Sequence, residues 1–326
     1  METFAPPFVF FEFLDFTIVV LCFIMNNMAM ITAQQLNTYY DTYRNTEVAF
    51  TKDILKTLSL DPRQIYIKCS GGQWPCIINS SSLSSAKIIV GTKGGAYEEM
   101  AKPEPPVMNL RFYFYQGDKQ TLSFFISCKV KQVQPYMNSN DLAIITLAFN
   151  QRPPDDFIIM LSHLIDANIN SVKRKDERIL INADSCRKLG IPKEEGTIVI
   201  DNVPRRCILR DISFGGAKVV VLGVAKFLVN KPTQLSLEFD DPHEIITLKG
   251  VVTDAVPVEG RKEIVATSIK YDENAVSLSY KIHINNYLTT TRKQDLDVAQ
   301  GKVPPAIATP QSISPDSPDS DIDATF

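Results

Sequence analysis

The sequence predicts a mainly β protein in which two strand-rich blocks are separated by a helix. Short apolar segments recur between Gly- and Pro-containing turns over residues 65–149 and again over 179–269. Between these blocks, residues 155–164 carry apolar side chains at helical spacing. The length of 326 residues suggests two domains, and the 44% hydrophobic and 22% charged residues are typical of a globular protein rather than a fibrous or wholly disordered one.

The first thirty residues form a hydrophobic N-terminal segment with three open interpretations. Phe8–Met25 is nearly long enough to span a bilayer, but Glu12 and Asp15 lie inside it, and each is costly in hydrocarbon. No Lys or Arg precedes the segment and no small-residue cleavage site follows, which argues against a signal peptide. The segment is therefore a membrane helix, an additional packed segment, or a sign that the natural chain starts at a later methionine, up to Met30. We favour the later start.

The N-terminal domain, residues 31–152, is predicted to begin with a helix and to continue as a small antiparallel barrel or sandwich. Thr32–Gln35 has the form of a capping box, in which a hydroxyl and an amide satisfy the first free N–H groups of a helix. Apolar side chains at three-, four- and seven-residue steps then predict one helical face that ends before Asp61–Pro62. These side chains are Leu36, Tyr40, Tyr43, Phe50, Ile54 and Leu58. The strands expected after them lie around residues 65–69, 74–78, 86–90, 110–114, 126–130 and 142–149.

A connecting helix over residues 153–170, with Asp155 as its N-cap, leads into the second block at 171–290. The strands expected there are 179–183, 197–200, 207–213, 217–222, 235–239, 245–253 and 264–269, followed by a closing helix over about 274–288. From 291 to 326, proline, serine and aspartate dominate without apolar periodicity, so we expect this acidic tail to be disordered.

The charge and the reactive residue types exclude several classes of function. The net charge of −3 argues against a protein that coats nucleic acid with a broad basic surface. The tail carries that whole excess, whereas Lys173–Arg210 has ten Lys or Arg residues against six acids, a local charge of +4. A neutral body with one basic patch suggests a compact anionic ligand. Three histidines, and six cysteines without a CxxC pair, argue against a metal site. The scattered cysteines are typical of core thiols in a reducing compartment.

Two short motifs in the second block are the candidates for chemistry. Arg174 and Arg178 form an RxxxR just after the connecting helix, and Asp211, Ser213 and Gly216 form a DxSxxG at the end of a strand. At these residues the sequence resembles the PilZ domain, a six-stranded barrel with a closing helix that binds the second messenger cyclic di-GMP. The resemblance covers about residues 171–290 and implies that these five residues bind cyclic di-GMP.

Including its N-terminal half, the chain looks like two-domain receptors of the YcgR type and of the PlzA type found in spirochaetes. This implies two small antiparallel β-barrels, an N-terminal YcgR-N/PilZN-like one and a C-terminal PilZ one, joined by a helix and an Arg-rich linker. It also implies a bacterial, cytoplasmic receptor that performs no catalysis. In it, cyclic di-GMP orders a mobile arginine loop against Asp211–Gly216 and re-orients one barrel relative to the other. The expected output is contact with an unidentified protein of the motility, flagellar, surface or virulence machinery, with no nucleic acid, membrane or cofactor partner.

The chemistry of the residues supports the same ligand. The planar fork of arginine matches guanine O6 and N7, or a phosphate, with two hydrogen bonds. An ionised carboxylate such as that of Asp211 only accepts, which suits the N1–H and N2–H₂ donors of guanine. Ser213 can add a hydroxyl or orient the turn. Gly216, like Gly215, can permit close backbone approach or a positive φ.

One departure from the family pattern and two rival functions stay open at this stage. The spacing of 33 positions from Arg178 to Asp211 is longer than we expect, and residues 192–204 look like an inserted hairpin. Considered singly, each motif fits a solvated charged loop or an ordinary turn. The rivals are a PilZ-like interaction scaffold that binds no nucleotide and a nucleic-acid-binding protein that uses the +4 patch.

Overall fold

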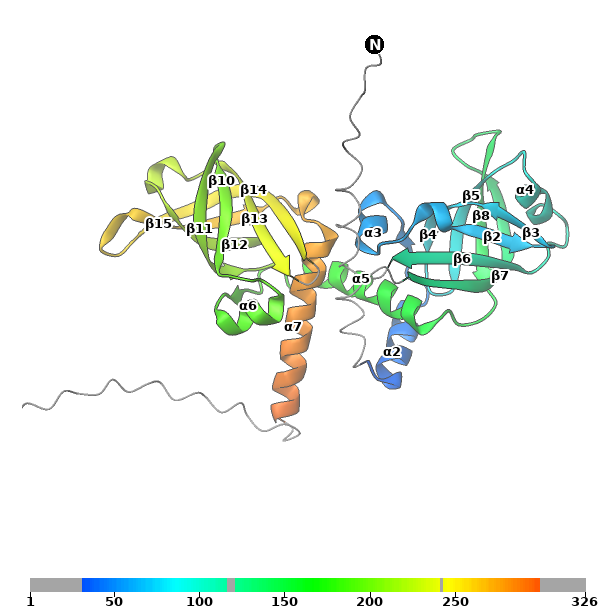
Figure 1. Cartoon of the computed structure of the whole chain (residues 1–326), viewed down its shortest axis with the longest axis horizontal. Helices are drawn as coiled ribbons and strands as arrows, with labels where there is room; N and C mark the ends of the chain where they lie inside the picture. Colours follow the sequence, from blue (N-terminus) through cyan, green and yellow to red (C-terminus); the bar gives the residue numbers. More distant parts are fainter. Residues whose placement is uncertain (1–30, 116–120, 241–242, 300–326) are drawn as a thin grey trace, which may run out of the picture. The chain divides into compact units, whose positions relative to one another are not determined.

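The computed structural model describes residues 31–115, 121–240 and 243–299 (Figure 1). The hydrophobic segment of residues 1–30 and residues 300–326 of the tail lie outside the described residues. Within the described ranges, no helix is both long enough and apolar enough to cross a membrane. The mainly β class is confirmed, since these ranges form one antiparallel sheet of eight strands and another of seven.

The N-terminal sheet has the strand order β1-β4-β5-β8-β7-β6-β2-β3, with β1 and β3 as its edges. Its strands are β1 (Val48–Ala49), β2 (Tyr66–Cys69), β3 (Gly72–Pro75), β4 (Ile77–Ser81), β5 (Ser85–Gly91), β6 (Met108–Tyr115), β7 (Thr121–Pro135) and β8 (Leu142–Phe149). Alternate residues of β6 face the core, where Leu110, Phe112 and Phe114 are fully buried. The five described cysteines are free and buried, and Cys22 lies outside the described residues.

The described helical segments of the N-terminal domain are α2 (Ala33–Tyr43), α3 (Lys52–Thr57), the 3₁₀ turn η2 (Pro62–Gln64), α4 (Gly95–Met100) and α5 (Asp155–Lys173). The predicted capping box is confirmed, because the Thr32 hydroxyl accepts from the Gln35 N–H and the Gln35 side chain accepts from the Thr32 N–H. The single helix expected to run to Leu58 is wrong. The first helix ends at Tyr43, and the next residues form β1, which pairs with β4. A second helix, α3, then begins with the Thr51 hydroxyl as its cap.

The apolar face of helix α5 packs into the core of the N-terminal domain, and the helix ends at the arginine motif. Phe157 is fully buried on it, and its ring centroid lies 4.9 Å from that of Phe112. The predicted N-cap at Asp155 is wrong by one residue. Pro154 is the N-cap, and its carbonyl accepts the first helical hydrogen bond, from Ile158. The helix continues to Lys173, beyond the predicted end at 170, so it leads directly into Arg174.

The C-terminal domain is a closed barrel of six strands. The strands follow the order β10-β13-β14-β15-β12-β11, and β11 pairs back with β10 to close the ring (Figure 1). They are β10 (Glu195–Ile200), β11 (Val203–Ile212), β12 (Gly216–Leu222), β13 (Pro232–Asp240), β14 (His243–Val258) and β15 (Arg261–Tyr271), and the short strand β9 (Ile179–Leu180) adds to β11. The predicted six-stranded barrel is therefore confirmed for this domain.

The long spacing between the two motifs has a different cause from the one the sequence suggests. Residues 192–204 do form a hairpin, but its strands β10 and β11 belong to the closed barrel and are not an insertion. Asp201 and Asn202 make its two-residue turn with φ of 51° and 64°. The element that the prediction lacks is α6 (Ala183–Leu189), where a strand was expected to continue to Ala183. Asn182 caps this helix, and Gly190 ends it in the left-handed conformation.

The closing helix is longer than predicted. After the 3₁₀ turn η4 (Glu273–Ala275), α7 runs over Leu278–Ala299, and a further 3₁₀ turn, η3 (Ala225–Phe227), follows β12. The expectation of disorder from Thr291 is wrong for residues 291–299, because these are mostly good helix formers and the first proline comes only at Pro304.

Candidate functional site

Strand pairing brings the two motifs together. β9 starts directly after Arg178 and pairs antiparallel with the end of β11, with Leu180 opposite Asp211 and Ile179 opposite Ile212. The strand that follows the RxxxR therefore lies beside the strand that carries the start of the DxSxxG. The prediction that the two segments converge depends on this register, which spans 33 residues of sequence.

The convergence produces an ion pair between the motifs. The guanidinium of Arg178 contacts a carboxylate oxygen of Asp211 through Nη1 and Oδ1. Asp211 is buried, whereas the Arg178 side chain is 44% exposed. A register shift between Leu209 and Asp211 interrupts the pairing of β11 with β12, and such a bulge re-aims the side chain that follows it. The site thus presents one cation that is open to solvent and one carboxylate at the barrel wall.

The backbone of the arginine loop is anchored to the second motif as well. The Gly215 N–H donates to the carbonyl oxygen of Lys175 at 3.1 Å. A Cβ atom on Gly215 would lie 2.8 Å from Cγ and 3.3 Å from the carbonyl oxygen of Lys175, so the loop approaches this closely because residue 215 is glycine. The Lys175 ammonium forms an ion pair with Glu273, which ties the same loop to the turn after β15.

Ser213 and Gly216 shape the turn between β11 and β12. The Ser213 hydroxyl lies 3.2 Å from both the N–H and the carbonyl oxygen of Gly216, and its own carbonyl accepts from the Tyr280 hydroxyl at 2.8 Å. A Cβ on Gly216 would lie only 2.2 Å from the carbonyl oxygen of Ile269 on β15. Gly216 does not have a positive φ. Ser213 thus orients the turn, and the missing Cβ of Gly216 lets β12 approach β15 closely. The contacts of both residues with a ligand stay predictions.

Arg174 lies at the other end of the loop. It is the C-cap of α5, where its N–H donates to Asn170 at 2.8 Å and its carbonyl accepts from the Glu177 N–H at 3.0 Å. Burial raises the pKa of Asp166, also on α5, and the positive charge of Arg174 partly opposes that rise. The structure thus joins Arg178 with Asp211, Ser213 and Gly216, while the contacts recorded for Arg174 within the described residues are with its own helix and turn.

Two buried tyrosines behind the ion pair were missed by the sequence analysis. Tyr271 ends β15 and Tyr280 lies on α7, and their rings meet edge to face at 5.9 Å. Burial raises the pKa of both phenols, and the positive charge of Arg178 offsets only part of that rise. Tyr280 also holds the Ser213 carbonyl. Their only sequence signal is a tyrosine within an apolar strand or helix pattern, which any core tyrosine gives.

Comparison with known proteins accounts for both halves of this architecture. The PilZN3 domain matches residues 34–168, and the PilZ domain matches residues 173–289. A curated protein of Treponema denticola named cyclic di-GMP binding protein is 45% identical over 273 residues, covering 83% of this chain and 86% of that protein. The chain belongs to the PilZ family.

Two solved PilZ-family structures are also similar. PlzA of Borreliella burgdorferi in complex with c-di-GMP has 23% sequence identity and a TM-score of 0.36, covering 78% of this chain and 98% of PlzA. YcgR of Escherichia coli in complex with c-di-GMP has 13% identity and a TM-score of 0.26, covering 77% of this chain and 92% of YcgR. Both motifs of this chain lie inside its PilZ match, and α5 runs from the PilZN3 match into the PilZ match.

Proposed function

We propose that this chain is a cyclic di-GMP receptor that performs no catalysis, and that Arg174, Arg178, Asp211, Ser213 and Gly216 form its binding site. The observation that carries the proposal is the meeting of the two motifs, through the Arg178–Asp211 ion pair and the hydrogen bond from Gly215 to Lys175. The name of the Treponema denticola relative supports the choice of ligand.

In the proposed complex, each motif meets a different part of the ligand. The guanidinium groups of Arg174 and Arg178 bind guanine O6 and N7 or a phosphate, because their planar forks match both. The Asp211 carboxylate accepts from the N1–H and N2–H₂ of guanine. Ser213 and Gly216 keep the turn in the shape that holds Asp211 at the barrel wall.

We further propose that binding re-orients the two domains and so changes a contact with a protein partner of the motility or surface machinery. The arginine motif follows α5 without a break, and the apolar face of α5 is part of the core of the N-terminal domain. A ligand that moves the arginine loop therefore acts on the end of that helix. We place the receptor in the cytoplasm, in keeping with the free and buried state of the five described cysteines.

Calorimetric titration of the full chain with cyclic di-GMP tests the site. We expect saturable heat for the wild type and a loss of about a hundredfold in affinity for Arg174→Ala/Arg178→Ala, since each bidentate contact contributes about 1–3 kcal/mol. The matched control is Arg206→Ala/Arg210→Ala, a second RxxxR pair on β11 outside both motifs, and we expect it to bind like the wild type.

The rival functions predict other outcomes. A protein that gives no heat with cyclic di-GMP is the interaction scaffold. Oligonucleotide binding that is steeply salt-dependent and insensitive to Asp211→Ala identifies a nucleic-acid-binding protein. Domain re-orientation is measured separately by energy transfer between dyes on Lys93→Cys and Glu259→Cys, two exposed positions in different domains. A ligand-induced change in transfer is expected, and an unchanged signal contradicts the re-orientation.

A further inference from the structure

The N-terminal domain contains a polar cavity of about 680 Å³ that is separate from the two motifs. Its wall is built from the end of α2, the β4–β5 hairpin, strands β7 and β8, and the segment that precedes α5. This volume lies within the range of about 300–1,000 Å³ that small-molecule sites occupy. The cavity lies before the N-terminal end of α5, and the arginine motif follows its C-terminal end. None of the residues that line the cavity belongs to either motif.

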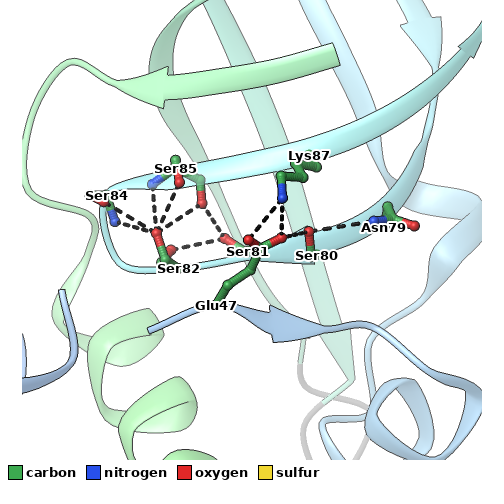
Figure 2. Close-up of polar contacts among 8 residues, drawn as sticks. All are labelled: Glu47, Asn79, Ser80, Ser81, Ser82, Ser84, Ser85 and Lys87. Carbon is green, nitrogen blue, oxygen red and sulfur yellow. Dashed lines mark hydrogen bonds and ion pairs between the residues drawn. The ribbon is translucent and has the colours of Figure 1, made fainter. Parts of the chain in front are cut away.

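The charge around this cavity favours an anion. Three cations line it, Arg44, Lys131 and Arg152, against one carboxylate, that of Glu47. Glu47 is already neutralised, because the Lys87 ammonium lies 2.8 Å and 2.9 Å from its two oxygens and the Ser80 hydroxyl also donates to it (Figure 2). Arg152 also lies 4.0 Å from the exposed Asp155 carboxylate, so Arg44 and Lys131 leave the cavity with a surplus of positive charge.

Two of these cations are held near each other by one aromatic ring. The guanidinium carbon of Arg152 lies 5.0 Å from the ring centroid of Tyr40, and that of Arg44 lies 5.7 Å from the same centroid. The two guanidinium carbons are therefore no more than about 11 Å apart, a separation at which like charges repel. Arg152 is further fixed by a hydrogen bond of 2.6 Å to the Asn37 side chain. A ligand with more than one negative charge between them removes this repulsion.

The hairpin between β4 and β5 adds a wall of fixed hydroxyl groups. The buried Ser82 hydroxyl accepts from the N–H groups of Ser84 and Ser85 at 3.1 Å and lies 3.0 Å from the Ser85 hydroxyl (Figure 2). The Ser84 hydroxyl donates to the Asn45 side chain at 3.1 Å. These bonds set the shape of the hairpin before any ligand arrives, so its hydroxyls need little reordering to bind polar groups.

We propose that this cavity is a second ligand site, which binds a small phosphate-bearing molecule with its phosphate between Arg44 and Arg152 and its polar remainder against the serine hairpin. Arginine binds phosphate oxygens through paired N–H donors, and the surrounding hydroxyls and amides suit a hydroxylated carrier more than an apolar one. The proposal does not depend on the cyclic di-GMP site, and it assigns the PilZN3 domain a ligand of its own.

The test uses the full chain carrying Arg174→Ala/Arg178→Ala, so that the first proposed site is silent. Pyrophosphate and glycerol 3-phosphate are the probes, and uncharged glycerol is the neutral counterpart. Binding is followed by calorimetry and by the thermal unfolding of the N-terminal domain, which contains the single tryptophan, Trp74. We expect both phosphate probes to give saturable heat and to raise the unfolding midpoint, and glycerol to do neither.

The variant Arg44→Gln/Arg152→Gln is expected to weaken phosphate binding about tenfold or more. The control Arg63→Gln/Lys93→Gln removes the same charge at exposed positions outside the cavity and is expected to bind normally. Lys131→Gln provides a second variant that leaves the two arginine–tyrosine contacts intact, and it too is expected to weaken binding. With both arginines of the motif restored, Arg44→Gln/Arg152→Gln is expected to keep wild-type affinity for cyclic di-GMP.

Four results overturn the proposal: no response to either phosphate probe, an equal response to glycerol, equal weakening in the control variant, or loss of cyclic di-GMP binding in the cavity variant. Loss of cyclic di-GMP binding in the cavity variant would show that the cavity belongs to the first site. It would therefore refute a separate second site but leave cyclic di-GMP binding by this chain in place.

Discussion

Replacing Gly216 with alanine tests the packing of the proposed site more directly than any charge change. The added Cβ would lie 2.2 Å from the carbonyl oxygen of Ile269, whereas ordinary Cβ contacts begin at 3.4 Å. Strands β12 and β15 would have to separate by about 1 Å, and a backbone carbonyl within a paired sheet cannot rotate away. We expect a destabilisation of about 3 kcal/mol, which lowers the unfolding midpoint of the C-terminal domain by about 10 °C or more.

Amide hydrogen exchange resolved by peptide is the suitable assay. Trp74 lies in the N-terminal domain, so its fluorescence serves as an internal reference for the half of the chain that should not change. Gly196→Ala is the matched control, since its Cβ would meet its nearest neighbour at an ordinary 3.4 Å in the same barrel. Gly215→Ala should displace the Lys175 loop, weaken cyclic di-GMP binding and leave the barrel stable. Unchanged exchange in β12 and β15 of Gly216→Ala would refute the close approach.

Three further outcomes are expected. Tyr280→Phe removes the hydroxyl that donates to the Ser213 carbonyl, so the C-terminal domain should lose about 1 kcal/mol in a denaturant titration, and an unchanged midpoint would contradict this bond. Burial lowers the pKa of His163 to about 4, so the His163 imidazole stays neutral in the folded protein at pH values where it takes up a proton in the unfolded chain. Wild-type stability should therefore fall by up to about 3 kcal/mol more than that of His163→Phe between pH 6.5 and 4, as measured by Trp74 fluorescence. Burial raises the pKa of Cys76 and Cys128 to about 12, so iodoacetamide at pH 8 should leave both thiols unmodified in the native protein, as read by mass spectrometry.

Where sequence patterns failed in the N-terminal domain, a distant contact decided the local structure. Helical spacing from Leu36 to Leu58 is present in the sequence, yet the chain leaves the helix after Tyr43. Val48–Ala49 pairs with Ser80–Ser81, more than thirty residues away, and no local pattern encodes that pairing. The capping box at Thr32 was predictable because every group in it lies within four residues.

The same distinction applies to the candidate site. The resemblance to the PilZ domain implied that the arginine loop and Asp211–Gly216 converge, but no local pattern encodes the pairing of β9 with the end of β11 that brings them together. Helix α6 was not predicted, since its seven residues are too few to show a clear helical period. The roles of Tyr271 and Tyr280 were also hidden, because they depend on the contact between the two rings and on the turn that the Tyr280 hydroxyl reaches, and not on their own surroundings in sequence.

The Arg178–Asp211 ion pair holds the Arg178 guanidinium in the proposed site and leaves it accessible to a ligand. Because nearly half of the arginine side chain is exposed, the pair contributes no more than about 1 kcal/mol. A ligand with a micromolar dissociation constant gains about 8 kcal/mol, so exchanging the carboxylate for a phosphate or a guanine edge costs a small share of that. The pair meanwhile keeps the guanidinium beside the barrel wall, which reduces the side-chain entropy lost when ligand binds. If the pair instead acted as a latch, Asp211→Ala would tighten cyclic di-GMP binding; because the carboxylate is proposed to accept from guanine, we expect that variant to bind more weakly.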